Sequence, residues 1–109
     1  MYDLGGGTLR QVWVLIGAQM DNRQLQIFHS VVKEGSFTKA AQLLRIAQPA
    51  VSIAIQKLER ELDVVLLNRA DKKVSLTPEG ARLLGHAEKI LLQFEQAIQE
   101  VQELNSLQT

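Results

Sequence analysis

Apolar side chains recur at the spacing of one helix face between residues 23 and 33. The members of this stripe are Leu25, Phe28, Val31 and Val32, and such a stripe is typical of a helix that packs against a core. Gly35 follows the stripe, and glycine readily adopts the left-handed conformation that ends a helix. The pattern therefore predicts a first helix that ends at Gly35.

A short second helix is expected over residues 37–44. Ser36 precedes it and is a good N-cap, because its hydroxyl can accept a hydrogen bond from a first-turn N–H. Ala40 and Ala41 are small enough to let another helix approach closely. After this helix a short turn is expected at residues 45–47.

The third expected helix, over residues 48–62, has two contrasting faces. Pro49 stands in its first turn, where the missing N–H needs no partner. The face that we expect to be buried carries Val51, Ile55, Leu58 and Leu62. The opposite face carries Pro49, Ile53, Gln56 and Arg60, flanked by Gln48, Ser52 and Lys57. This outer face is uncharged near its start and basic towards its end.

Two short β-prone runs follow, at residues 64–67 and 74–76. The residues between them, 68–73, are mostly polar or charged, so the segment predicts a two-stranded hairpin with a charged tip. Three short helices followed by such a hairpin describe a winged helix-turn-helix, in which the hairpin is the wing.

A long helix is expected over residues 78–109, after Thr77 as a capping residue and Pro78. Its apolar positions alternate at intervals of four and three, which is a heptad pattern. The positions that we expect at a helix–helix interface are Leu83, Ala87, Ile90, Leu91, Phe94, Ala97, Ile98, Val101 and Leu104. Because so small a head cannot cover so long a stripe, the stripe predicts a partner helix from a second copy of the chain. The stripe could instead pack against the head, but its length favours the dimer.

Composition restricts the classes of function that remain. The chain has 109 residues, of which 46% are hydrophobic and 22% charged, and it contains no cysteine, so one small packed domain without disulfides or thiolate metal sites is expected. His29 and His86 each lack a second ligand nearby, so no metal and no cofactor are expected. Ser52 has no neighbouring base, and Glu59 and Glu61 are expected on exposed helix faces. An enzyme is therefore not expected.

The formal net charge is zero, which by itself argues against a nucleic acid as partner. The distribution is uneven, however: residues 20–80 carry nine basic and seven acidic side chains, and residues 81–109 carry two and four. Because salt confines phosphate attraction to nearby charges, the mildly basic head is the candidate DNA-binding part.

Residues 1–19 differ from the rest of the chain, with the glycine run 5–7 followed by the short apolar run 12–16. The apolar run is too short to span a bilayer, and the glycines lack the Lys and Ser/Thr of a phosphate loop. We therefore interpret residues 1–19 as an extension (a tag, a cloning scar or an alternative start), residues 20–77 as the winged helix-turn-helix and residues 78–109 as the linker helix.

Several spaced motifs together resemble one family. The strings GSFTKAAQLL, AQPAVSIAIQKLERELDVVLLNR and SLTPEG closely resemble the N-terminal domain of LysR-type transcriptional regulators, and the resemblance extends from Met20 to about Leu107. It implies a mainly α fold, a winged helix-turn-helix followed by a long linker (coiled-coil) helix. It also implies a cytoplasmic, nucleoid-associated homodimer, joined by antiparallel linker helices, that binds double-stranded DNA at an inverted-repeat operator. A tetramer of the full-length parent stays open, and the effector domain of such a parent is absent from this chain.

The resemblance also implies roles for individual residues. Gln48, Pro49 and Ser52 match family residues at the start of the recognition helix, and a glutamine amide can pair bidentately with adenine. The basic wing residues suit phosphates or the adjacent minor groove. The complete set of expected DNA-contacting residues is Thr38, Lys39, Gln48, Pro49, Ala50, Ser52, Ile53, Gln56, Lys57, Arg69, Lys72 and Lys73. For the helix residues the alternative is an ordinary solvated face, and for the wing an ordinary charged turn.

The chain departs from the family pattern at four positions. Ile53 stands where a polar or basic residue is usual, so apolar contact replaces a hydrogen bond to a base. Asp63 replaces a glycine, which we expect an Asp to tolerate in the left-handed conformation. Leu67 replaces an aromatic core residue, and Asn22 replaces an apolar one. Only the first departure touches the specificity of binding.

Overall fold

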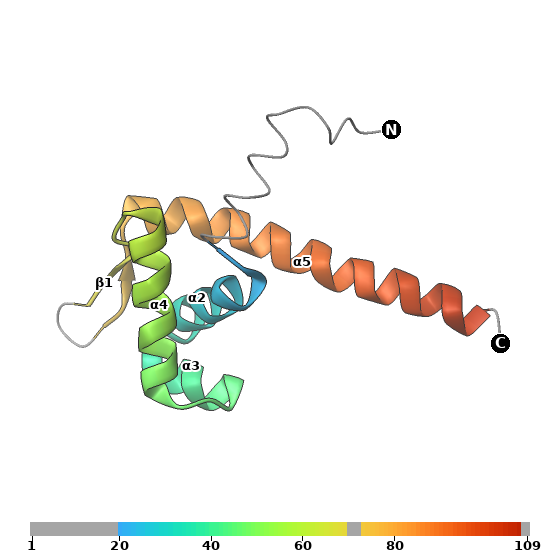
Figure 1. Cartoon of the computed structure of the whole chain (residues 1–109), viewed down its shortest axis with the longest axis horizontal. Helices are drawn as coiled ribbons and strands as arrows, with labels where there is room; N and C mark the ends of the chain where they lie inside the picture. Colours follow the sequence, from blue (N-terminus) through green and yellow to red (C-terminus); the bar gives the residue numbers. More distant parts are fainter. Residues whose placement is uncertain (1–19, 70–72, 108–109) are drawn as a thin grey trace.

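The computed structural model describes residues 20–69 and 73–107. Within them the elements follow in the order α2 (Asn22–Glu34), α3 (Phe37–Leu44), α4 (Gln48–Leu62), β1 (Leu67–Asn68), β2 (Ser75–Leu76) and α5 (Pro78–Leu107). Figure 1 shows α2, α3, α4 and the hairpin gathered into a unit that we call the head (residues 20–69 and 73–77), while α5 continues far beyond it. The expected mainly α winged helix-turn-helix with a long following helix is confirmed.

Helix α2 begins with a cap that the apolar pattern did not show. Asp21 accepts a hydrogen bond from the Gln24 backbone N–H (2.8 Å), and the Gln24 side chain accepts one from the Asp21 N–H (3.0 Å). This reciprocal capping box satisfies two N–H groups that the helix itself cannot. At the other end Gly35 has φ of 66°, as predicted for a left-handed cap.

Helices α3 and α4 have the predicted bounds. The Ser36 hydroxyl accepts from the Lys39 N–H at 3.1 Å, so the predicted N-cap of α3 is confirmed. Asp63, with φ of 55°, ends α4 in the left-handed conformation predicted for it. Arg45 also has a positive φ, 58°, between α3 and α4. There the Ile46 N–H donates to the Ala41 carbonyl at 3.0 Å, which closes the tight turn between the two helices.

The core of the head lies where α2, α3 and α4 meet. Its largest side chains without solvent exposure include Phe28 and Val31 from α2, Ile55 and Leu58 from α4, and Leu66 from the segment before β1. Ala40 is fully buried as well, in keeping with the close approach predicted for α3. The predicted inner face of α4 is therefore confirmed as part of the core, although Leu62 at its end is only partly buried.

The hairpin is shorter than the sequence predicted, and one strand is displaced. The pairs are Leu67 with Leu76 and Asn68 with Ser75, so residues 64–66 and Val74 are not in strands. For Val64 and Leu66 the reason is that their N–H groups already bond to α4: the Val64 N–H donates to the Glu59 carbonyl (3.1 Å), and the Leu66 N–H donates to Glu59 Oε2 (2.7 Å).

The prediction that Glu59 and Glu61 lie on exposed faces is wrong. The Glu59 side chain is only 18% exposed, and it accepts from the N–H groups of both Leu66 and Leu67. Glu61 is half-buried and accepts from Gln24 Nε2 at 3.3 Å. Both carboxylates hold the head together.

Thr77 fastens the start of α5 to the segment before β1. Its hydroxyl accepts from the Gly80 N–H (2.9 Å) and donates to the Val65 carbonyl (2.6 Å), while its own N–H donates to the Leu66 carbonyl (3.1 Å). Gly80 is buried here, and a Cβ at this position would overlap the Leu66 carbonyl oxygen. Only glycine therefore permits this close approach of backbone to backbone.

The first part of α5 packs against α2. Ala87 is fully buried, and Leu83 and Leu84 contact the core cluster. At the edge of this contact Glu88 Oε2 lies 2.9 Å from Lys33 Nζ and 3.5 Å from His29 Nε2. The Lys33 ammonium, by hydrogen bonding and by its charge, lowers the pKa of Glu88, and His29 adds to the effect.

Candidate nucleic-acid interface

The outer face of α4 is open to solvent. Five of the six residues that we call by this name are exposed and Ser52 is half-buried; they are Gln48, Pro49, Ser52, Ile53, Gln56 and Lys57. Ile53, the apolar departure from the family pattern, is 62% exposed. Ala50, which we also expect to contact DNA, is exposed in the first turn. One helix thus presents all the α4 residues that the sequence singled out.

Gln48 and Ser52 are joined in a way that sequence reasoning missed. Gln48 Nε2 donates to Ser52 Oγ at 3.1 Å, one helical turn further along. This bond holds the glutamine amide along the start of α4, with one N–H and the carbonyl oxygen left for other partners. The signal was available, since polar side chains four residues apart on a helix face one another.

The start of α3 lies beside the wing. A shallow depression of about 260 Å³ is lined by residues from both, namely Ser36, Phe37, Thr38, Arg69, Lys73 and Val74. Thr38, Lys39 and Lys73 are exposed. The fold therefore brings together polar and basic groups from α3 and from the wing, whereas Lys72 lies outside the described residues.

Arg69 has two partners among the described residues of its own chain. Its Nη2 lies 3.6 Å from Glu59 Oε1, and its guanidinium carbon lies 4.7 Å from the centre of the Phe37 ring. This arrangement could not be predicted from the sequence, because the three residues belong to three different segments.

The predicted dimerisation positions fall into two groups. Ala87 is fully buried in its own chain, so no surface of it is left for a partner, and Leu83 contacts the core. Leu91 is half-buried. The remaining positions are exposed and form what we call the apolar stripe of α5: Ile90, Phe94, Ala97, Ile98, Val101 and Leu104.

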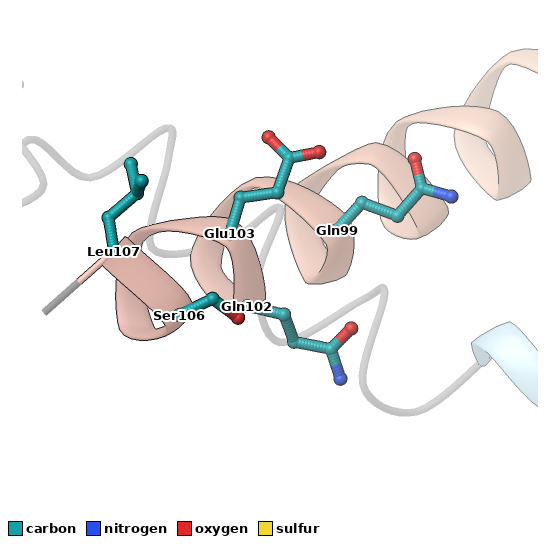
Figure 2. Close-up of a pocket in the computed structure, with 5 residues that line it drawn as sticks. All are labelled: Gln99, Gln102, Glu103, Ser106 and Leu107. Carbon is teal, nitrogen blue, oxygen red and sulfur yellow. The ribbon is translucent and has the colours of Figure 1, made fainter. Parts of the chain in front are cut away.

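A second depression, of about 660 Å³, lies at the far end of α5 and is lined by Gln99, Gln102, Glu103, Ser106 and Leu107. Figure 2 shows that these side chains leave the helix in different directions instead of converging on one point. Within the described residues the lining comes from one helix only, and it forms no closed site for a small molecule. Across the described residues, no group of three or more His, Asp or Glu side chains is placed to hold a metal ion.

The architecture defines a class of protein: a winged helix-turn-helix in which the outer face of α4 is open to solvent and Arg69 and Lys73 lie in the described part of the wing. The family model described as the bacterial regulatory helix-turn-helix protein, lysR family, matches residues 22–81. The chain therefore belongs to the LysR family and carries its helix-turn-helix DNA-binding domain. None of the helices in the described ranges is both long and apolar enough to cross a membrane.

Relatives and solved structures agree with this assignment. The chain is 45% identical over 85 residues to a probable RuBisCO transcriptional regulator of Porphyra purpurea, covering 78% of this chain and 27% of that protein. It is 49% identical over 86 residues to the regulator BsdA of Bacillus subtilis, covering 78% and 30%. The DNA-binding domain of BenM, in complex with catB site 1 DNA, shares 44% identity at a TM-score of 0.77, covering 80% of this chain and 98% of that one. The chain thus spans under a third of the length of these two regulators.

Proposed function

We propose that this chain binds operator DNA as the DNA-binding part of a longer transcriptional regulator, with the outer face of α4 in the major groove. The observation that carries the proposal is the open, largely uncharged start of that face, with a held glutamine at its first position. The similar BenM domain, which was crystallised with DNA, supports it. A protein acting on an operator works at the nucleoid, so we expect a cytoplasmic location.

The chemistry of the first turn suits base edges. The Gln48 amide has a carbonyl oxygen and one N–H still free after its bond to Ser52, which is the pair of groups that recognises adenine. Pro49, Ala50 and Ile53 offer apolar contact to a thymine methyl group. We expect Gln56 and Lys57, further along the helix, to reach the DNA backbone.

Contacts to the sugar–phosphate backbone fall to the flanks of α4. We expect Thr38 and Lys39 at the start of α3, and Lys73 in the wing with Lys72 beside it, to face phosphates or the adjacent minor groove. Such contacts fix the register of a protein on the duplex and make its affinity depend on salt.

The apolar stripe of α5 supports a homodimer. Phe94 is 53% exposed and Val101 is 66% exposed, and such residues in a continuous row favour burial against a second helix. We propose antiparallel pairing of two α5 helices and binding to an inverted repeat, because a two-fold dimer matches a two-fold site. The net charge of zero makes the second half-site important, since long-range attraction to phosphates is weak.

Selection of bound duplexes from a random pool tests the function directly. The expected result is a half-site repeated in inverted orientation. A chain that forms dimers but enriches no sequence and binds no duplex would contradict the proposal and would indicate a dimerisation module alone.

Gln48→Ala then tests base recognition on the selected operator. We expect about a tenfold loss of affinity on the operator and almost none on random duplex, because one bidentate contact contributes roughly 1–3 kcal/mol of discrimination. Gln99→Ala, at the far end of α5, is the matched control and should leave both affinities unchanged. Equal losses on both duplexes for Gln48→Ala would refute its role in reading bases.

A further inference from the structure

Arg69 is held from two sides, by an acidic and by an aromatic group. On one side its guanidinium meets Glu59 Oε1 at 3.6 Å, and on the other it lies over the Phe37 ring at 4.7 Å. The Arg69 side chain is 39% exposed. Its position directly follows β1, so the cation stands at the base of the wing.

Glu59 connects this cation to the rest of the wing. Its other carboxylate oxygen, Oε2, accepts from the Leu66 N–H (2.7 Å) and the Leu67 N–H (3.3 Å). The Glu59 carboxylate of α4 therefore holds both the backbone at the start of β1 and the side chain of Arg69, which directly follows β1. Through the Phe37 ring, the same guanidinium reaches the first residue of α3.

We propose that Arg69 is a positioning residue, whose guanidinium sets the distance between the wing and the start of α3. These are the two segments that flank α4 and contact the DNA backbone, so Arg69 determines the spacing of their phosphate contacts. This inference rests on the proposed function. It differs from the sequence-based expectation, in which Arg69 itself neutralises a phosphate.

Charge and shape both favour positioning over a phosphate contact. The Glu59 carboxylate already compensates the charge of Arg69, whereas no ion pair involves Lys73 among the described residues. A planar guanidinium can stack on a ring and pair with a carboxylate at the same time, and a lysine ammonium cannot reproduce that combination. Lysine does, however, serve well as a phosphate ligand.

Arg69→Lys distinguishes a positioning role from a phosphate contact, because it keeps the positive charge and removes the planar guanidinium group. We expect affinity for the operator to fall about fivefold. Phe37→Leu, which leaves every cation in place, should cause a similar loss, and Phe37→Tyr, which keeps the ring, should bind like the wild type. Lys89→Arg, an exchange of cations on the exposed surface of α5 outside the proposed DNA interface, is the control and should bind within about twofold of wild type.

The double variant Arg69→Lys/Phe37→Leu supplies the decisive measurement. If the two residues act as one unit, its affinity should lie within about twofold of either single variant. The exchange of the backbone amide hydrogens at residues 67–68 and 75–76, measured without DNA, should rise by the same factor in all three variants. Circular dichroism should show a folded head in each.

Four results would overturn the proposal: binding of Arg69→Lys within twofold of wild type, no rescue by the tyrosine, losses that add in the double variant, or a head unfolded by Arg69→Lys. If the wild-type chain bound no duplex, the proposed function would fail, while the exchange measurement would still decide whether Arg69 positions the wing.

Discussion

Large apolar side chains are buried in the head and exposed in the far half of α5. In the head, Phe28, Ile55 and Leu58 are completely buried by the chain's own elements. Beyond Ala87, by contrast, Phe94 is 53% exposed and Val101 is 66% exposed. Figure 1 shows why, since none of the other helices in the described part of the chain lies beside the end of α5. The head thus has a complete core, whereas the apolar stripe of α5 is left exposed by its own chain.

Leu58→Ala should have the largest effect, because it opens a cavity in the complete core. We expect the free energy of unfolding to fall by about 2–5 kcal/mol. The loss should be the same at low and high protein concentration, since Leu58 is already fully buried within its own chain. Urea denaturation at two concentrations measures it, and a loss that depends on concentration would show that the head is not complete alone.

Phe94→Glu should disrupt dimerisation through the apolar stripe of α5. A charge in the middle of the apolar stripe should weaken the dimer at least 30-fold, which corresponds to about 2 kcal/mol. Sedimentation should then show monomers with a folded head.

Leu92→Glu is the matched control, because Leu92 is also 53% exposed but lies on a different side of α5 from the stripe. It should leave the dimer intact. A dimer that persists in Phe94→Glu, or one that Leu92→Glu dissociates, would place the interface elsewhere.

Gly80→Ala should strain the contact between the start of α5 and the segment before β1, which we call the joint between α5 and the head. The added Cβ overlaps the Leu66 carbonyl oxygen, so α5 or the segment before β1 must shift, at about 1–3 kcal/mol. Thermal unfolding measures the cost. Gly85→Ala is the control, since nothing lies within 4 Å of a Cβ there, and it should not destabilise the chain. Equal behaviour of the two variants would show that the joint can relax.

The smallest expected effect concerns Glu88, which pairs with Lys33 and His29 across α5 and α2. The pKa of Glu88 is lowered below its ordinary value of 4.5, so the pairing stabilises the fold at neutral pH and is lost as the pH falls through the lowered pKa. Glu88→Gln should therefore be slightly less stable than the wild type at neutral pH and equal to it in strong acid. Unfolding midpoints across this pH range measure the difference. A difference that grows on acidification would contradict the sign.

Much of the fold could be predicted because its signals are local. Ser36, Pro49 and Gly35 mark helix ends with groups that act within a few residues, and the bounds of α3 and α4 were predicted correctly. The missed capping box of Asp21 and Gln24 was local too, so it was open to the same reasoning. Nothing in the described residues explains Asn22, whose Oδ1 is buried without a hydrogen-bond partner.

The sequence alone determined the helices, the outer face of α4 and the apolar stripe of α5, because periodicity and capping depend only on near neighbours along the chain. Only the tertiary structure decided that Glu59 shortens the hairpin and that Arg69 links the hairpin to Phe37. It also decided that Gly80 must lack a side chain and that Ala87 belongs to the core. These contacts join segments from different elements. The pattern of residues within one segment does not predict which carboxylate, aromatic ring or carbonyl group of another segment will contact it in the fold.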